Sequence, residues 1–455
     1  MQKETGKRKI HFTTLGCPKN QVDTEVMAKM VQRAGFELTA NPKEADIITV
    51  NTCAFLKASQ EESISAILNL SQQKQNGRCK KLIVTGCLPS RHPEEIAKEL
   101  PEVDHFLGTG DLEKLNQILL NNSAFKSSIH HCKESKIPQE LLGERLTDGS
   151  PISRYLKISE GCDRRCSFCI IPSIRGDQIS RSIDSLVKEA KSLVHQGAKE
   201  ISLIAQDLTA YGHDLPKSTR LEDLLEPLIN EIPNLPWIRL HYVYPQRISD
   251  RLIDLLAEKN SLLPYLDMPI QHISSRVLKQ MNRATSSDQL RKLLDKLRNR
   301  IPDLTLRTTF IVGFPGETDQ DFQELYQFLK EFRFEHVGAF MFSQEPGTPA
   351  AHFVNQVPEK EKTARFQQLM TLQKQVSFEN NQDRIGKILS AMVLGPSEES
   401  EFLIKARCEH QAAEIDGLTY ITDVGDPPCN LNPGDLVKIH IQESHDYDLA
   451  GALAN

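Results

Sequence analysis

The stretch Cys162-Asp-Arg-Arg-Cys166-Ser-Phe-Cys169 places three cysteines on one short loop, directly after a predicted strand at Tyr155–Ser159. Soft thiolates at spacings of four and three residues suit the ligation of an iron–sulfur cluster. A cuboidal 4Fe–4S cluster usually takes four cysteines, and the loop carries no fourth. We therefore expect one iron without a protein ligand, free to coordinate a substrate or cofactor. The alternatives are a structural zinc site completed by His195 or another remote ligand, and thiols brought together by chance.

The strand before this loop begins a series of six predicted strands, with amphipathic helical stretches between them. The predicted strands are Tyr155–Ser159, Glu200–Ala205, Trp237–Val243, Leu262–Met268, Thr305–Val312 and His336–Phe342. Six β–α units are two fewer than a closed eightfold barrel has, so the series predicts an α/β fold with an open, partial (β/α)6 barrel. The cysteine loop then lies at the carboxyl ends of the strands, where barrel enzymes build their active sites.

An earlier β–α series predicts a second parallel sheet, of the doubly wound type. Its strands are predicted at Lys9–Thr14, Asp46–Val50 and Leu82–Thr85, and the residues Gly16–Asn20 have the composition of a turn before a helix at Val22–Ala34.

Cys17, Cys53 and Cys87 each come just after one of these three strands. Parallel strands bring their carboxyl ends to one edge of a sheet, so we expect the three thiols to converge and ligate a second cluster, again with an open iron. For any one of them alone, a buried apolar cysteine is the better interpretation. Cys79, Cys132, Cys408 and Cys429 lack such placement and are expected to be structural.

A small all-β barrel is predicted at the carboxyl end of the chain. Short strands separated by Gly, Pro and Asp are predicted at Ile388–Val393, Phe402–Arg407, Leu418–Ile421 and Leu436–Ile441. The expected organisation is an N-terminal domain at 1–123, a polar linker at 124–150, the partial barrel with a bridging helix at 151–386, and the β-barrel at 387–455.

The composition of the 455 residues agrees with three folded domains: 39% are hydrophobic and 25% charged, which excludes a disordered or collagen-like chain. No run reaches the roughly 18 apolar residues that cross a bilayer, and the charged N-terminus has no apolar segment behind it. We therefore expect a cytoplasmic protein without a membrane partner. In that reducing compartment the ten cysteines are better explained as metal ligands or catalytic thiols than as disulfides.

The carboxyl-terminal domain is strongly acidic. Ser390–Asn455 holds three Lys and Arg residues against twelve Asp and Glu residues, whereas the whole chain has a formal charge of −6. A β-barrel that grips RNA needs cations to neutralise phosphates, so this one is expected to prefer a basic protein. The alternative is a solvated acidic surface without a partner.

The cysteine loop resembles the signature of the radical S-adenosylmethionine (SAM) superfamily, C-x3-C-x2-C with an aromatic residue before the third cysteine, here Phe168. The resemblance implies that Cys162, Cys166 and Cys169 hold the catalytic cluster and that SAM chelates the open iron. One electron from the cluster then cleaves SAM to methionine and a 5′-deoxyadenosyl radical.

Further residues are candidates for binding SAM. The resemblance implies that Phe168 packs against the adenine, although a core aromatic is the alternative. Gln206 and Gln271 follow predicted strands, where they are hydrogen-bond candidates for SAM or, alternatively, ordinary loop residues. Gly313 begins Gly313-Phe-Pro-Gly-Glu317, which resembles the superfamily's strand-end glycine motif, where glycine lets the backbone approach the cofactor.

The three units together resemble the methylthiotransferase family, whose last domain is a TRAM domain. Members insert sulfur at an unactivated C–H bond and deliver it methylated, either to tRNA (MiaB type) or to ribosomal protein S-twelve (RimO type). Gln206-Asp207 is similar to the second branch, since the tRNA enzymes usually have Gln-Asn there. The other stretches similar to it are Leu15–Asn20, Tyr155–Gly161, Gln206–Gly212 and Tyr265–His272, whereas the Pro-Gly-Thr ending of Phe342–Thr348 is shared with the tRNA branch.

The resemblance implies a specific reaction. Two SAM molecules are used per product, one as methyl donor and one as radical source, and the substrate is the β-carbon of an aspartate in ribosomal protein S-twelve. Sulfur comes from the second 4Fe–4S cluster, held by Cys17, Cys53 and Cys87, and a donor such as flavodoxin or ferredoxin supplies electrons. A tRNA adenosine methylthiotransferase is the related alternative, although tRNA is not the expected partner. An iron–sulfur electron carrier or an RNA-binding module is the alternative that is not an enzyme.

Overall fold

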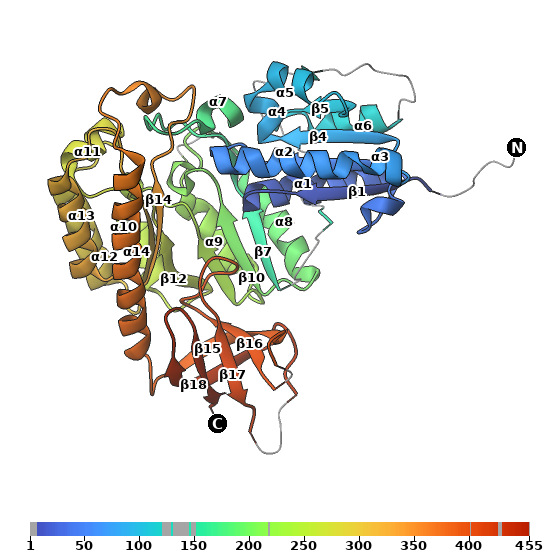
Figure 1. The fold of residues 1–455 in the computed structure, drawn as a ribbon. Coiled ribbons are helices and arrows are strands. Elements are labelled where there is room, and N and C mark those ends of the chain that lie inside the picture. The colour runs from blue at the N-terminus through green and yellow to red at the C-terminus, as the bar shows by residue number, and fades with distance from the viewer. Residues whose placement is uncertain are drawn as a thin grey trace, which may run out of the picture.

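The computed structural model describes residues 7–120, 129–130, 145–146, 152–216, 219–400, 402–425 and 430–454. Within these ranges the chain forms two parallel α/β units and a small β-barrel (Figure 1). The N-terminal unit lies beside the upper part of the central unit in that view, and the C-terminal barrel lies below it. No helix of the described ranges combines the length and apolar character that a membrane span needs.

The N-terminal sheet has six parallel strands in the order β2-β1-β3-β4-β5-β6. They are β1 Lys9–Thr14, β2 Glu37–Leu38, β3 Ile47–Thr52, β4 Lys81–Gly86, β5 His105–Leu107 and β6 Ile129–His130. All six residues of β3 are buried, as its β-branched composition requires in a sheet covered on both faces.

Helices cover both faces of this sheet, which confirms the doubly wound prediction. One face packs against α1 (Pro18–Arg33) and α6 (Leu112–Leu120), and the other against α2 (Lys57–Ser71) and α5 (Pro93–Glu99). A short helix, α3 (Gln73–Asn76), follows α2.

One helix of the N-terminal unit begins earlier than the sequence pattern indicates, and one short helix was not predicted. Helix α1 starts at Pro18 rather than at Val22, with Cys17 as its N-cap residue, so Lys19 and Asn20 belong to its first turn and not to a turn before it. Proline suits this position because the first helical N–H has no intrahelical partner to lose. The short helix that was not predicted is α4 (Cys87–Arg91), and Cys87 is its first residue.

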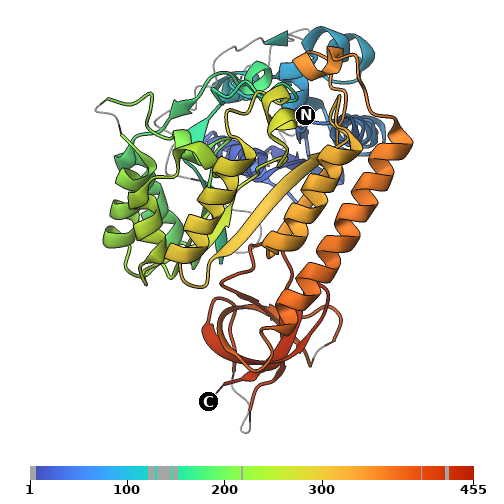
Figure 2. The ribbon, with the colours of Figure 1, turned by 90° about the vertical axis from the view of Figure 1, so that its left-hand side faces the viewer.

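The central unit is an open sheet of six parallel strands in the order β14-β13-β12-β11-β10-β7, which confirms the partial barrel; Figure 2 shows its curvature. The strands are β7 Ser153–Lys157, β10 Glu200–Ile204, β11 Trp237–Leu240, β12 Leu262–Asp267, β13 Thr305–Val312 and β14 His336–Met341. The helices are α7 Ile171–Arg175, α8 Ile183–His195, α9 Leu221–Glu231, α10 Asp250–Ala257, α11 Ser275–Gln280, α12 Ser287–Arg300 and α13 Asp319–Phe332.

The first central strand ends sooner than predicted. Strand β7 stops at Lys157, and Ser159–Glu160 forms a separate short strand, β8, antiparallel to β9 (Ile179–Ser180). The chain thus leaves the main sheet before the cysteine loop.

Helix α14 (Glu359–Gln382) runs from the top of the central unit to the C-terminal barrel (Figure 2). The barrel is closed in the order β15-β16-β17-β19-β18. Its strands are β15 Ile388–Pro396, β16 Ile404–Cys408, β17 Thr419–Asp423, β18 Leu436–Ser444 and β19 Leu449–Leu453.

Strand β19 was not predicted, because Ala and Gly have low strand propensity. Its Gly451 lies so close to a neighbour that an added Cβ would be 2.2 Å from the backbone oxygen of His440. Pairing with β17 and β18 therefore defines this strand more than its composition does.

Buried ion pairs attach the barrel near the amino ends of the central strands. Glu200, the first residue of β10, accepts a hydrogen bond from Arg239 Nε at 2.8 Å and pairs with Arg407 of β16. Asp416 of the barrel lies 2.7 Å from Arg307 Nη1 and accepts a hydrogen bond from the Tyr265 hydroxyl at 2.8 Å. The opposite ends of the central strands are left for the active site.

Candidate active site

Three thiols of the central unit lie on the loop between β8 and α7. Cys162 and Cys166 are buried and Cys169 is partly buried. The backbone N–H of Cys169 donates to the Cys166 oxygen at 3.1 Å, which keeps the loop compact. Burial raises the pKa of Cys162 to about 11 and that of Cys169 to about 12. These thiols are therefore protonated at neutral pH unless a metal cation stabilises the thiolates.

Three further thiols lie at one edge of the N-terminal sheet. The parallel register pairs Thr14 with Asn51 and Thr52 with Gly86, so the chain segments that carry Cys17, Cys53 and Cys87 leave the sheet side by side.

Glycine at position 16 allows the close approach of two of these segments. Gly16 has a φ of +91°, and an added Cβ would lie 2.9 Å from Cys53 Sγ. Asn20 ties the edge together, because its amide donates to the backbone oxygens of Leu15 at 2.8 Å and Thr52 at 3.0 Å.

The donor set of both groups fits an iron–sulfur cluster. All eight cysteines in the described ranges are free, and six of them form these two triads. In the same ranges no group of three or more His, Cys, Asp and Glu side chains is arranged to hold a single metal ion. Ligation of a cluster by each of the two cysteine triads therefore stays a prediction.

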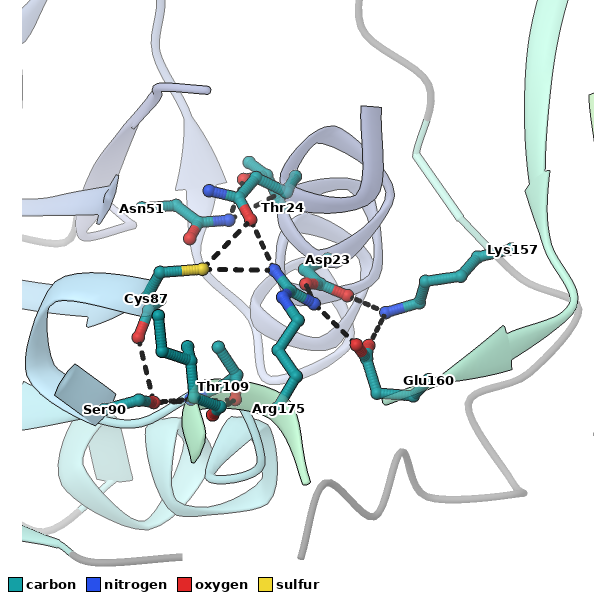
Figure 3. A network of polar contacts seen from close by, with 12 residues as sticks. Asp23, Thr24, Asn51, Cys87, Ser90, Thr109, Lys157, Glu160 and Arg175 are labelled. Atoms are coloured by element: carbon teal, nitrogen blue, oxygen red, sulfur yellow. Dashed lines mark hydrogen bonds and ion pairs between the residues drawn. The ribbon is translucent and has the colours of Figure 1, made fainter. Parts of the chain in front are cut away.

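A buried network of charges connects the two domains at Cys87, as Figure 3 shows. Arg175, the last residue of α7, donates to Asn20 Oδ1 at 2.6 Å and to Cys87 Sγ at 3.5 Å in the N-terminal unit. Its other nitrogen donates to Glu160 Oε1 at 2.8 Å. Lys157 donates to Glu160 Oε2 at 2.6 Å and pairs with Asp23 of α1.

The network contains two carboxylates and two cations, so their formal charges balance. Burial alone would raise the pKa of Glu160, but Arg175 and Lys157 lower it well below its usual value. Glu160 therefore stays ionised and holds Arg175 against Cys87. The Cys87 thiol of one domain is thus positioned by a residue of the other.

Lys19 makes a second contact between the domains. Its Nζ lies 3.3 Å from the centroid of the ring of Tyr242, which follows β11 at the carboxyl end of the central sheet. Burial lowers the pKa of Lys19 to about 8, against the opposing effect of Cys17. Tyr242 has a φ of +63°, and such strain in a tyrosine is typical of functional sites.

A third contact involves the Pro-Gly-Thr segment after β14. Arg91 at the end of α4 donates to Glu345 Oε2 at 2.9 Å, and both side chains are 4% exposed. The backbone N–H of Lys57 donates to Glu345 Oε1 at 3.0 Å. This segment does not discriminate between the branches of the resembled family, but it does fasten the two domains together.

The four predicted SAM-binding residues differ in their surroundings. Gln206 donates to Glu160 Oε1 at 3.0 Å, while its own Oε1 is buried without a hydrogen-bond partner in the described part of the chain. Gln271 has a φ of +71°, and its backbone bridges to β13 through Thr309 and Ile311.

Phe168 and Gly313 have structural neighbours. Phe168 is partly buried and packs against a cluster that includes Phe314 and Phe342. Gly313 has a φ of +71°, and an added Cβ would lie 2.3 Å from Cγ of Lys362 on α14. Close packing of this helix therefore also explains the glycine.

Sequence reasoning missed the charged residues that join the domains. Lys157 and Glu160 lie among apolar and small residues, Tyr155-Leu-Lys-Ile-Ser-Glu-Gly161, and opposite charges within such a run are a signal of burial. No sequence signal identifies their partners Asp23 and Arg175, because those contacts are between distant segments.

Comparison with known proteins assigns a family region to each unit. Residues 9–108 match the uncharacterized protein family UPF0004, residues 156–329 match the radical SAM superfamily, and residues 385–453 match the TRAM domain.

Curated relatives match nearly the whole chain. The ribosomal protein uS12 methylthiotransferase RimO of Geobacter sulfurreducens is 47% identical over 447 residues, which cover 98% of this chain and 99% of that protein. The protein of the same name from Myxococcus xanthus is 44% identical over 448 residues, 98% of this chain and 91% of its own length.

A solved structure shares the arrangement of the α/β units. The radical SAM methyltransferase TsrM of Kitasatospora setae, with tryptophan substrate and a SAM analogue bound, has a TM-score of 0.57 at 14% identity. The match covers 84% of this chain and 78% of that one, and at this identity it shows the fold alone.

Proposed function

The chain belongs to the RimO family of radical SAM methylthiotransferases, and we propose that it modifies the β-carbon of an aspartate in ribosomal protein uS12. One structural observation carries the proposal: each α/β domain holds a cysteine triad, and the buried Arg175 of the central domain contacts Cys87 of the N-terminal triad. A reaction that takes hydrogen from a carbon and returns sulfur to it needs two such centres to face one substrate.

The enzyme uses SAM and iron–sulfur chemistry, as its superfamily does. In our proposal one 4Fe–4S cluster is held by Cys162, Cys166 and Cys169, and a second by Cys17, Cys53 and Cys87. Bound there, the clusters supply an electron to SAM and sulfur to the substrate. Arg175 and Asn20 keep Cys87 in place, and Arg283, with Nη1 4.0 Å from Cys166 Sγ, places a positive charge beside the first triad.

The proposed reaction replaces the β-hydrogen of the aspartate with a methylthio group. The hydrogen leaves in 5′-deoxyadenosine formed from one SAM, and a second SAM gives the methyl group. An external donor of the flavodoxin or ferredoxin class supplies the electrons.

We assign SAM contacts to Phe168, Gln206, Gln271 and Gly313. Gln206 has the clearest structural support, because a buried amide oxygen without a partner is costly and a bound donor group would satisfy it.

The partner surface is proposed on the C-terminal barrel. Arg407, one of the three Lys and Arg residues of Ser390–Asn455, is buried and its charge is paired with Glu200. Lys405 pairs with Glu398, which leaves Lys438 as the exposed cation in the described part of Ser390–Asn455. Such a surface attracts a basic ribosomal protein and repels nucleic acid. With a ribosomal protein as its substrate, the enzyme is proposed to act in the cytoplasm.

The test offers both substrates to one preparation. Anaerobically reconstituted enzyme, SAM and a reductant are incubated with uS12 and, separately, with bulk tRNA, and both products are analysed by mass spectrometry. We expect a methylthio group on one aspartate of uS12 and 5′-deoxyadenosine in the same tube. Methylthiolated tRNA with unmodified uS12 would replace this proposal with the tRNA enzyme, and SAM cleavage absent under all conditions would favour an electron carrier.

A further inference from the structure

Lys19 carries a buried positive charge that interacts electrostatically with the proposed cluster ligand Cys17 but forms no hydrogen bond with it. The residue is 7% exposed and lies in the first turn of the 16-residue helix α1. Its ammonium lies over the Tyr242 ring, and among the described residues it has no hydrogen-bond or ion-pair partner. A buried charge without a hydrogen-bonded counter-charge is costly, so a partner from outside the chain would stabilise it.

The carboxylates near Lys19 are already engaged. Glu160 accepts hydrogen bonds from Lys157 and Arg175. Asp267 accepts a hydrogen bond from the Tyr242 backbone at 3.3 Å and lies 3.6 Å from His241 Nδ1. Neither is available as the dedicated partner of the ammonium group.

Lys19 lies in the region that the reacting carbon of the substrate must occupy in the proposed reaction. Lys19 comes two residues after Cys17, and Tyr242 lies where the central sheet ends. A carbon that loses its hydrogen to SAM on the central unit and gains sulfur at the N-terminal unit must lie between these two places. In aspartate the carboxylate is bonded directly to that carbon, so a group that binds the carboxylate must lie there too.

We propose that Lys19 binds the side-chain carboxylate of the target aspartate and so selects the acid over its amide. The inference rests on the proposed function and adds the residue that recognises the substrate. The ring of Tyr242 supports the ammonium from one side and leaves its donors to point elsewhere. An asparagine of the same shape would leave the buried ammonium without a counter-charge, and a site discriminates against an analogue that leaves its buried polar groups unpaired.

The test is a cycle of enzyme and substrate changes on the full-length, reconstituted protein. Binding of uS12 and of a uS12 variant with asparagine at the target position is measured for the unmodified enzyme and for Lys19→Met, Lys19→Arg and Lys57→Met. Lys57→Met is the matched control. Lys57 is the first residue of α2 in the same domain, and its side chain is 81% exposed.

We expect the unmodified enzyme and Lys57→Met to bind the aspartate form at least about tenfold more tightly than the asparagine form, as a charge-assisted hydrogen bond provides. Lys19→Met is expected to bind both forms equally, and Lys19→Arg to recover part of the preference. Circular dichroism and iron content establish that each variant is folded and loaded.

Three outcomes would overturn the inference. Lys19→Met could weaken both forms by the same factor, which would mean that Lys19 serves the cysteines or the domain contact. Lys19→Met could also keep the full preference for aspartate. If it fails to fold, equal binding of the two forms by the unmodified enzyme decides against the inference. An enzyme that methylthiolates tRNA and ignores uS12 refutes the proposed function instead, so the two failures are distinguishable.

Discussion

Arg175 shows how one residue can align two domains. Arg175 is 3% exposed, and its guanidinium contacts Cys87, Asn20 and Glu160 at once. Arginine suits this role because its planar group presents donors in several fixed directions, which an ammonium does not. The cysteine that it contacts belongs to the other domain, so Arg175 fixes the position of Cys87 relative to the central domain.

Replacing Arg175 tests this role through stability. Arg175→Met is expected to lower the free energy of unfolding by about 3–5 kcal/mol, since among the described residues it leaves Lys157 as the cation paired with both Asp23 and Glu160. Urea unfolding measures the change. Arg251→Met is the control, because its ion pairs are at the surface and are worth about 0–1 kcal/mol. Equal effects of the two substitutions would mean that the buried network does not hold the domains.

The proposed roles of the six cysteines lead to a second prediction at the scale of single residues. Reconstituted protein should hold about eight irons, and alanine at Cys162, Cys166 and Cys169 should leave about four. Alanine at Cys17, Cys53 and Cys87 should also leave about four while SAM cleavage to 5′-deoxyadenosine continues and methylthiolated product is lost. Iron analysis measures the iron content, and chromatography measures 5′-deoxyadenosine and the methylthiolated product.

Cys79 provides the control for the iron count. It is buried in the same domain, and Cys79→Ala should keep about eight irons. Four irons in the unmodified protein would remove the second cluster from the mechanism.

At the scale of elements, the sequence predicts what local composition determines. The β-branched run of β3 and the alternation of strands and helices predicted both parallel sheets, and the strand ends predicted where the thiols would lie. Strands β2 and β6 have two residues each and are defined by their pairing with a neighbour, so no local signal marks them. The site followed the same division: the spacing of Cys162, Cys166 and Cys169 is local, whereas Arg175 meets Asp23 across the domain contact.

The joint between β10, β11 and β16 gives a pH-dependent prediction. Burial would raise the pKa of Glu200, but Arg407 and Arg239 lower it well below its usual value. A carboxylate with a depressed pKa in the folded state stabilises the fold above its unfolded pKa of about 4.3, and this contribution is lost as the pH falls further. Glu200→Gln should therefore destabilise the protein by about 3–5 kcal/mol at pH 7, and its difference from the unmodified protein should shrink below about pH 4.

Urea unfolding at several pH values measures this difference. Glu231→Gln, on a carboxylate that is 51% exposed, should change stability little at any pH. A difference between Glu200→Gln and the unmodified protein that stays constant with pH would show that Glu200 is not ionised at the joint.

At the scale of the whole molecule, charge is divided between the domains. Ser390–Asn455 has a formal charge of −9, although the whole chain has only −6, so the rest of the molecule is slightly basic. Helix α14 and the ion pairs of Glu200 and Asp416 fix the acidic barrel relative to the active site. The negative field therefore has a constant direction as a partner approaches.

This arrangement predicts that the acidic barrel governs how fast uS12 associates. Glu399, Asp423 and Glu443 are exposed on it, and their joint replacement by Lys should slow association with uS12 by about tenfold or more at low salt, with a smaller effect on dissociation. Replacing the exposed Glu62, Glu258 and Asp295 by Lys elsewhere on the molecule alters the net charge equally and should slow association much less.

Rapid-mixing kinetics at several salt concentrations measures the association and dissociation rates. The difference in association rate between the two variants should narrow near 0.15 M salt, where screening acts over about 8 Å. If both variants slow association alike, net charge rather than the barrel steers the partner; if neither does and the unmodified enzyme binds tRNA tightly, the acidic surface is merely solvated and the substrate is tRNA.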